Sequence, residues 1–317
     1  MNPAQAAERP CADAVLMIRP ARFGANPETA DSNRFQQAGS GADAHDTARR
    51  EFDGLVSRLR TAGIFVQVAD DTSEPPKPDA CFPNNWVSFH ADGSVVLYPM
   101  MAPSRRAERR AEPIAQLREA GFRVARTIDL SHWESQDEFL EGTGSLVLDR
   151  CHRIAYACRS PRTTTRALAD FARRLGYRVV AFDALGPDGR PAYHTNVLMA
   201  IGEGFSVICA AAIPDAGQRR AVLDELRVAG HQPIEIDVAG MHGFAGNLLA
   251  LRDALGRQVI AMSDTAWASL SPGAKDALAT HGNIVTAPIP TIERHGGGSV
   301  RCMIAEVFLP RGAAGGE

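Results

Sequence analysis

Hydrophobic and polar residues follow one phrase that returns five times along this chain: an amphipathic stretch, a glycine and then a run rich in β-branched residues. The glycines are spaced 58, 55, 54 and 52 residues apart, and they are Gly63, Gly121, Gly176, Gly230 and Gly282. A repeat of this length is typical of one supersecondary unit used several times. The pattern therefore predicts five equivalent units.

The periodicity within each phrase predicts the order strand, strand, helix, strand. In the third phrase we expect strands over 139–148 and 153–158, a helix over 164–175 and a last strand over 177–182. The same order is predicted for three other phrases, over 80–89, 94–100, 113–120 and 122–128, over 193–201, 205–210, 216–229 and 233–236, and over 244–252, 258–262, 271–280 and 284–287.

The first phrase differs because a long polar excursion over 21–46 separates its strand at 14–19 from its helix at 47–62. A strand at 64–68 completes this phrase. The last strand of the chain, at 300–309, is expected to pair with this first unit.

One such unit cannot bury its apolar face alone, so neighbouring units must stack. Five ββαβ units that close on themselves predict an α/β fold, namely a five-bladed α/β propeller with pseudo-fivefold symmetry. The alternative is five unrelated α/β segments whose helices end in glycine, as many helices do. We expect a single propeller domain over 13–310, with flexible tails at 1–12 and 311–317.

The first strand of each unit carries polar residues that core strands usually avoid. Glu141, His194 and Cys302 belong to three different units. The intervals of 53 residues from His194 to Asn247 and of 55 residues from Asn247 to Cys302 repeat the helix period. This register gathers Glu141, His194 and Cys302 around one pocket. A thiol, an imidazole and a carboxylate are the nucleophile, the base and the orienting group of covalent catalysis.

Each of these residues also has a structural interpretation. A cysteine in a strand is more often a small buried hydrophobe, and this is our interpretation of Cys158 and Cys209. Cys302 differs because three glycines precede it and Arg301 adjoins it, so we expect a lowered thiol pKa. Glu141 also fits a surface turn, but a carboxylate beside apolar strand residues is costly unless it is paired.

Composition narrows the class of protein. A net charge of −3 over 317 residues, without a continuous basic block, argues against a nucleic-acid-binding protein. No run approaches the ~18 apolar residues of a membrane helix, and we see no signal-peptide pattern. Six cysteines without paired spacing indicate free thiols and a cytoplasmic protein. Dinucleotide, P-loop and serine-hydrolase motifs are missing, and no metal-ligand spacing stands out.

The motifs that open the units resemble, in their order, those of the guanidine-modifying superfamily of five-bladed α/β propellers, the penteins. This superfamily includes arginine deiminases, dimethylarginine dimethylaminohydrolases and amidinotransferases, and the likeness is closest to the bacterial citrulline-utilisation hydrolase type. It extends over nearly the whole chain. The motifs are Pro78-Asp79-x-x-Phe82-x-Asn84-Asn85, Glu141-Gly142, His194-Thr195-Asn196 and Gly296-Gly297-Gly298-x-x-Arg301-Cys302.

The resemblance implies a role for each motif. Cys302 is the nucleophile, His194 the general acid and base, and Glu141 a carboxylate that orients the histidine or holds the guanidine. Both arginines of the implied binding set stand where the family binds the substrate carboxylate, although both also fit solvated surface positions. The residues implied in substrate binding are Asn26, Asp79, Asn84, Asn85, Arg105, Arg162 and Asn196.

Two departures refine the implied activity. Deiminases usually carry aspartate where Asn85 and Asn196 stand. An asparagine accepts a hydrogen bond from an N–H group and also donates one to a ureido oxygen. Asn85 resembles the dihydrolases of this superfamily, which carry arginine past citrulline to ornithine.

The resemblance therefore implies a hydrolase that cleaves C–N bonds of a guanidino or ureido group in arginine- or citrulline-like substrates, through a covalent intermediate on Cys302. This chemistry requires no metal and no organic cofactor, and its partner is a small amino acid. The alternatives are an amidinotransferase that uses an amine acceptor, a dimethylarginine-type hydrolase, and a non-catalytic propeller that binds a partner. The oligomeric state, a homo-oligomer included, stays open. We expect the excursion over 21–46 to fold over the pocket and select the substrate.

Overall fold

The computed structural model describes residues 8–33, 35–37, 43–186 and 189–312. These residues form five three-stranded sheets that share one topology. In each sheet the middle strand pairs antiparallel with one neighbour and parallel with the other. The repeated phrase of the sequence therefore corresponds to a repeated unit of structure.

The strands, given sheet by sheet in the order of their pairing, are β15 (Ala305–Glu306), β1 (Ala14–Arg19) and β2 (Phe65–Asp70); β3 (Val87–Phe89), β4 (Ser94–Leu97) and β5 (Arg126–Asp129); β6 (Val147–Asp149), β7 (Ile154–Cys158) and β8 (Arg178–Phe182); β9 (Met199–Gly202), β10 (Phe205–Ile208) and β11 (Gln232–Glu235); and β12 (Leu249–Arg252), β13 (Gln258–Ser263) and β14 (Asn283–Ala287).

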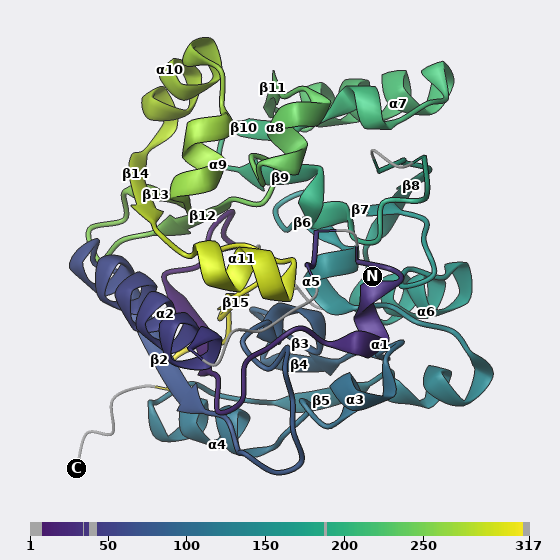
Figure 1. The fold of residues 1–317 in the computed structure, drawn as a ribbon. Helices are drawn as coiled ribbons and strands as arrows, with labels where there is room; N and C mark the ends of the chain where they lie inside the picture. Colours follow the sequence, from purple (N-terminus) through teal and green to yellow (C-terminus); the bar gives the residue numbers. More distant parts are fainter. Residues whose placement is uncertain (1–7, 34, 38–42, 187–188, 313–317) are drawn as a thin grey trace.

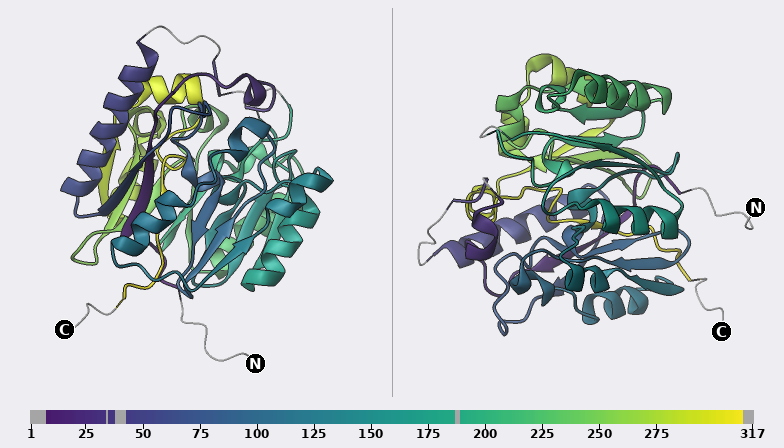
Figure 2. Two further views of the ribbon diagram at one scale, coloured as in Figure 1. Left: turned by 90° about the horizontal axis from the view of Figure 1, so that it is seen from below. Right: turned by 90° about the vertical axis from the view of Figure 1, so that its right-hand side faces the viewer.

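A helical crossover joins the two parallel strands of each sheet, as parallel pairing requires. The longer crossover helices are α2 (Ala44–Thr61), α4 (Glu112–Glu119), α6 (Thr165–Leu175), α7 (Ala216–Val228) and α10 (Pro272–His281). They lie on the outside of the molecule, around the sheets (Figures 1 and 2). Within the described ranges, no helix combines the length and the apolar character that crossing a membrane would need.

Shorter helical elements complete the chain, and two of them, α5 and α11, lie near the middle of the view in Figure 1. They are α1 (Pro27–Ala30), α3 (Pro103–Arg106), α5 (Gly142–Ser145), α8 (Val238–His242), α9 (Asp264–Ser269) and α11 (Pro290–Gly296), with the 3-10 turns η1 (Pro83–Asn85), η2 (Ser131–Gln136), η3 (Thr195–Val197) and η4 (Ala210–Ala212).

The two ends of the described chain meet in the first sheet. β15 pairs antiparallel with β1, with Val15 opposite Glu306 and Leu16 opposite Ala305. This confirms that the last segment of the chain pairs with the first unit. The strand predicted over 300–309 is nevertheless reduced to two residues, because the chain turns through hydrogen bonds such as Cys302 N–H to Ser299 O before it becomes extended.

The opening strands begin later than the alternating pattern predicts. Strands predicted to start at 80, 139 and 193 start at Val87, Val147 and Met199, because η1, α5 and η3 come first. Asn, Pro, Gly and Ser dominate these turns, and such residues favour turns over strands. The prediction that Glu141 lies inside a strand is wrong, since this residue is the N-cap of α5.

Two of these turns pack so closely that one position requires glycine. Gly142 has φ +47, and a Cβ on it would stand 2.2 Å from the carbonyl oxygen of Asn84. Neither the backbone angle nor the space allows a side chain there. Gly142 therefore fixes how near the first turn of the third unit comes to η1 in the second.

The helix-stopping glycines serve two different geometries. Gly63, Gly121, Gly176 and Gly230 have φ between +71 and +89, which is the left-handed conformation common just after a helix. Gly282 is extended, with φ 177, and a Cβ there would lie 2.6 Å from the carbonyl oxygen of Gln258. At Gly282, therefore, the lack of space for a side chain requires glycine, and the backbone angle does not.

The tail predicted over 1–12 is wrong for residues 8–12. Glu8, Cys11 and Ala12 are buried, and the Glu8 carboxylate accepts a hydrogen bond from Arg150 at 3.2 Å. This segment packs against the domain because, without Glu8, the buried Arg150 would lose its carboxylate partner. At the other end, Arg311 forms an isolated bridge with Phe122. Residues 1–7 and 313–317 of the predicted tails lie outside the described residues.

Helix α2 illustrates how a crossover helix is held. Its residues Phe52, Leu55 and Leu59 are fully buried and follow the spacing of one helical face. They belong to the same core cluster as Val66 of β2 and Ala287 of β14, so that α2 packs across two neighbouring sheets.

Replacing Leu55 by alanine tests this packing. Leu55 is fully buried, so we expect Leu55→Ala to lower the free energy of unfolding by about 2–5 kcal/mol. Leu255, which is 76% exposed, is the matched control, and Leu255→Ala should change the value by less than about 0.5 kcal/mol. Urea unfolding followed by circular dichroism measures both, and equal losses would show that α2 does not pack as described.

Candidate active site

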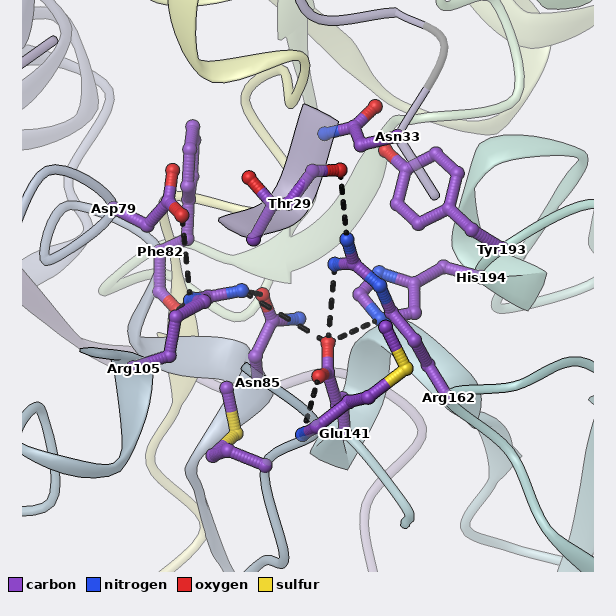
Figure 3. Close-up of polar contacts among 12 residues, drawn as sticks. Thr29, Asn33, Asp79, Phe82, Asn85, Arg105, Glu141, Arg162, Tyr193 and His194 are labelled. Atoms are coloured by element: carbon purple, nitrogen blue, oxygen red, sulfur yellow. Dashed lines mark hydrogen bonds and ion pairs between the residues drawn. The ribbon is translucent and has the colours of Figure 1, made fainter. Parts of the chain in front are cut away.

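Four segments from different units surround one polar cavity of about 270 Å³ (Figure 3). η1 supplies Asn85, Glu141 is the N-cap of α5, His194 is the N-cap of η3, and a turn before β15 supplies Cys302. The lining residues are Thr29, Asn33, Asp79, Phe82, Asn85, Arg105, Arg162, Tyr193, His194, Gly296, Gly297, Gly298 and Cys302. The predicted gathering of thiol and imidazole in one pocket is therefore present in the structure.

His194 is held by the carboxylate of Glu141. Its Nε2 lies 2.9 Å from Glu141 Oε2, and both side chains are buried. Burial lowers the pKa of His194 to about 4, against the opposing effect of Glu141. The imidazole is therefore neutral at neutral pH, with its proton on Nε2. Nδ1 is left as an acceptor, and Gly144 lies so close that a Cβ there would stand 2.7 Å from it.

Glu141 is the centre of a buried charge cluster. Its Oε2 accepts a hydrogen bond from Arg162 at 3.3 Å, and its Oε1 accepts one from the backbone N–H of Met101 at 3.1 Å. Arg105 lies within 3.9 Å of Oε2. Burial by itself raises the pKa of this carboxyl, but the charge of Arg162 and the hydrogen bond from His194 outweigh it. Glu141 therefore stays ionised well below its usual range.

The thiol of Cys302 faces two amide donors. Asn247 Nδ2 lies 3.3 Å and Asn196 Nδ2 3.5 Å from its Sγ. Burial raises the pKa of Cys302, and the Asn247 hydrogen bond and the nearby Arg301 only partly offset this effect. The expectation of a lowered thiol pKa is wrong, because the Arg301 guanidinium contacts Glu306 at 2.8 Å instead of the sulfur.

Asn247 was not among the predicted site residues, although the sequence carries a signal for it. It lies 53 residues after His194, close to the helix period, and it precedes the opening strand of the fifth unit as His194 precedes that of the fourth. Its Oδ1 also accepts the backbone N–H of Arg301 at 3.1 Å, and its Nδ2 donates to the carbonyl of Asn196 at 3.0 Å. Asn247 therefore fixes both the turn that carries Cys302 and the neighbouring asparagine.

Arg105 and Arg162 are both buried, so their interpretation as solvated surface arginines is wrong. Arg105 forms a bidentate pair with Glu108, with both N···O distances 2.9 Å. Its Nη1 donates to Asn85 Oδ1 at 2.8 Å. Most of its N–H groups are thus already occupied, which leaves no free fork for a substrate carboxylate.

Asn85 presents an unpaired donor. Because Arg105 has only donors, its contact at Oδ1 orients the Asn85 amide, and Nδ2 is left buried with no partner among the described residues. Asn85 lines the cavity. Its free N–H group therefore suits a ligand that brings an acceptor oxygen to this point.

Asp79 lines the cavity and is held by Asn26, whose Nδ2 donates to its Oδ2 at 2.8 Å. Burial raises the pKa of Asp79, and the charge of Arg105 partly opposes this. Asn26 itself does not line the cavity. Its Oδ1 accepts the N–H of Glu28 and caps α1, so it is a positioning residue.

Two other predicted binding residues lie behind the cavity wall. Asn196 contacts the sulfur of Cys302, and its Oδ1 has no partner among the described residues. Asn84 is fully buried and its side-chain amide is likewise unpaired, while its backbone carbonyl accepts a hydrogen bond from Thr143. Neither side chain belongs to the residues that line the cavity.

The polar excursion covers the cavity where the structure describes it. Asn33 donates to the carbonyl of Gly296 at 3.2 Å, and Arg162 donates to Thr29 O at 3.4 Å and to the hydroxyl of Ser32 at 2.5 Å. Thr29 and Asn33 line the cavity. The sequence predicted that this segment covers the pocket, but not which of its residues would line it. Residues 34 and 38–42 lie outside the described residues.

A second, wider cavity of about 1200 Å³ adjoins the first. The two cavities share Arg162 and Tyr193 in their walls. Arg162 lies 5.2 Å from the centre of the Tyr193 ring, and the Tyr193 hydroxyl donates to Gly297 O at 2.8 Å. These two side chains therefore form a partition between the polar cavity and a mostly apolar one.

Removing the Asn247 amide tests its effect on the thiol. Asn247→Ala removes a donor that lowers the pKa of Cys302, so we expect that pKa to rise further and alkylation at pH 8 to slow by about tenfold, as for loss of a hydrogen bond to a charged group. The rate should rise with pH in both proteins. Asn283→Ala, at an exposed position, is the matched control. Equal rates for the two variants, measured with iodoacetamide and mass spectrometry at Cys302, would contradict the assignment.

Solved structures of similar fold include an arginine dihydrolase and an amidinotransferase. The product-bound N-terminal domain of ArgZ, an arginine dihydrolase from the ornithine-ammonia cycle in cyanobacteria, matches with a TM-score of 0.73 and 20% identity, over 94% of this chain and 99% of that domain. Unliganded AgrE matches with a TM-score of 0.73 and 20% identity, over 95% of this chain but 40% of its own length.

SxtG, an amidinotransferase from Microseira wollei in the saxitoxin biosynthetic pathway, matches with a TM-score of 0.71 and 12% identity, over 97% of both chains. No curated protein matches the chain. The family model described as N,N dimethylarginine dimethylhydrolase, eukaryotic, matches residues 19–309. The chain therefore belongs to the N,N-dimethylarginine dimethylhydrolase family and, with it, to the guanidine-modifying superfamily.

Proposed function

We propose that this protein hydrolyses C–N bonds of the guanidino or ureido group of an arginine- or citrulline-like amino acid. The observation that carries the proposal is the cavity in which Cys302 and His194 stand together, with His194 bound to Glu141 at 2.9 Å. A buried thiol that lines the same cavity as a neutral imidazole is suited to nucleophilic attack on a ligand between them, coupled to proton transfer.

The charges around the cavity suit a planar, cationic head group. Asp79 lies on the wall and offers carboxylate oxygens to a guanidinium, while the ionised Glu141 stands behind the wall and adds negative charge beside the cavity. Such pairing of carboxylates with planar N–H groups is both strong and directional. Arg162 lines both the cavity and the wider one beyond it, and its N–H groups contact Glu141, Thr29 and Ser32. We infer that a substrate carboxylate binds Arg162 in place of its contacts to Thr29 and Ser32.

The reaction would proceed in two halves. The sulfur of Cys302 forms a bond to the central carbon of the head group while its proton passes to His194 Nδ1. The C–N bond to the departing nitrogen then breaks, and His194 returns the proton to that nitrogen. Water, deprotonated by His194, next attacks the carbon, and the C–S bond breaks to regenerate the thiol. Ammonia leaves when a terminal nitrogen departs, and ornithine leaves when the internal nitrogen departs.

Asn85 supports a ureido group as a second substrate. Asn85 lines the cavity and its Nδ2 has no partner among the described residues, so this donor is available to the head group, where citrulline carries an oxygen and arginine carries a nitrogen. An aspartate at this position would offer no donor to that oxygen. We therefore infer that arginine is hydrolysed to citrulline and ammonia, and that citrulline is then hydrolysed to ornithine, ammonia and carbon dioxide.

Three further inferences belong to the same proposal. The contacts between neighbouring sheets, such as the bridge between Ala12 and Leu251, support a closed ring of five units, a five-bladed propeller. The complete set of Cys302, His194 and Glu141 supports an enzyme over a partner-binding propeller. We place the reaction in the cytoplasm, where the free thiols of the chain persist.

A direct assay tests the reaction. Arginine and citrulline are supplied separately, and ammonia, citrulline and ornithine are quantified. We expect ornithine from both substrates, and no turnover by Cys302→Ser, whereas Cys151→Ser at an exposed position should retain activity. Turnover confined to dimethylarginine, which the family model favours as the second candidate, or dependent on added glycine, would replace this proposal by a dimethylarginine hydrolase or an amidinotransferase.

Exchanging Asn85 for aspartate tests the two-step conversion. In Asn85→Asp the donor to the ureido oxygen is lost, at a cost of about 1–3 kcal/mol. We expect citrulline to accumulate from arginine and the kcat/KM for citrulline to fall by at least about tenfold. Asn283→Asp, an exposed asparagine, is the control. An unchanged ratio of ornithine to citrulline would show that Asn85 does not select the ureido group.

A further inference from the structure

Two histidines and an aspartate meet beside the end of β6 that is farther from α5. Asp149 ends β6, His152 lies in the turn before β7, and His231 lies between α7 and β11. His152 Nδ1 and His231 Nε2 each lie 2.8 Å from the same carboxylate oxygen, Asp149 Oδ2. The three ligand atoms all lie within 4.8 Å of one another.

Hydrogen bonds to Asp149 do not give every ring nitrogen of this cluster a partner. For both rings to donate to Asp149 Oδ2, each must carry its proton on the nitrogen that faces the carboxylate. His231 is 8% exposed, and its Nδ1 is then a buried acceptor without a partner among the described residues. The two rings stand nearly perpendicular, 6.2 Å apart, so that both aim an edge at one point rather than stacking.

The chemistry of the set matches a divalent transition ion. Imidazole nitrogen and carboxylate oxygen bind Zn²⁺ at roughly 2.0–2.2 Å, and three such ligands with one water make an open tetrahedral site. An ion would take one lone pair from each ring, at His152 Nδ1 and His231 Nε2, and each ring would keep its proton on its other nitrogen. His152 lies in an exposed turn, so its ring can adjust while Asp149 and His231 stay fixed by burial.

The surroundings leave room for the water. A cavity of about 570 Å³ adjoins the cluster and is lined by all three residues. Cys151 and Glu203 also line it, although the Cys151 thiol donates to the carbonyl of Glu8 at 3.4 Å and does not belong to the cluster. The site therefore opens to solvent on one side, which provides a path for the ion.

We propose that Asp149, His152 and His231 bind one divalent transition ion of the Zn²⁺ class. The ion would join the turn of the third sheet to the turn of the fourth, since Asp149 and His231 belong to neighbouring sheets and are 82 residues apart in sequence. It goes beyond the proposed hydrolysis and takes no part in it. The two sites are separated by α5 and β6, because Glu141 precedes α5, whereas Asp149 is the last residue of β6.

The test uses Zn²⁺ and the full chain, without a histidine tag, carrying Cys302→Ser and Cys151→Ser so that no reactive or exposed thiol competes for the metal. Isothermal titration calorimetry should show one equivalent bound. Adding His152→Gln, at a half-exposed position that the fold does not need, should weaken binding at least tenfold. His132→Gln is the matched control, since His132 is exposed and lies outside the cluster.

Zn²⁺ should also raise the unfolding temperature of the His132→Gln protein and not of the His152→Gln protein, because an ion that binds only the folded chain stabilises it. Equal affinity in the two histidine variants, or no binding to the parent, would overturn the proposal. Because the parent already lacks Cys302, neither result depends on whether the hydrolysis proposed above is correct.

Discussion

The structure depends above all on one carboxylate without solvent contact. Glu141 is fully buried, yet it holds an imidazole, a guanidinium and a backbone N–H group at once. A buried charge is tolerated only when such partners compensate for the loss of water, and removing one partner of a buried pair typically costs about 3–5 kcal/mol. The segments that supply these partners are therefore held at fixed distances from one another, and the cavity forms where they meet.

The charges around Glu141 are compensated in the same way. Arg105 balances Glu108 and orients Asn85, and Arg162 reaches from Glu141 to the segment that covers the cavity. Each guanidinium thus connects a group facing the cavity to one behind it. A substrate head group that enters meets side chains whose positions are already determined, so little reorganisation accompanies binding. The neutral His194 and Cys302 carry no charge of their own into this balance at neutral pH.

Much of this arrangement can be predicted from the pattern of residues. The five phrases correspond to five sheets of one topology, and His194 and Cys302 line one cavity because each lies in the turn just before the outer antiparallel strand of its sheet. Asn247 follows from its place before the opening strand of the fifth unit. The helical turns that replace the first part of three opening strands could not be predicted in this way. Alternation over so few residues is compatible with both a strand and a helical turn, and the packing of neighbouring turns, such as Gly142 against Asn84, decides between them.

The sequence by itself determined the repeat, the order of elements and which residues share a position in it, since these follow from local periodicity and spacing. Only the tertiary structure decided the protonation of the site and the partners of its arginines. The pKa of a thiol depends on how much water the surrounding chain excludes, and Arg301, its neighbour in sequence, points to Glu306 in space. Likewise, Arg105 has its donors occupied by residues whose distance to it is set by packing.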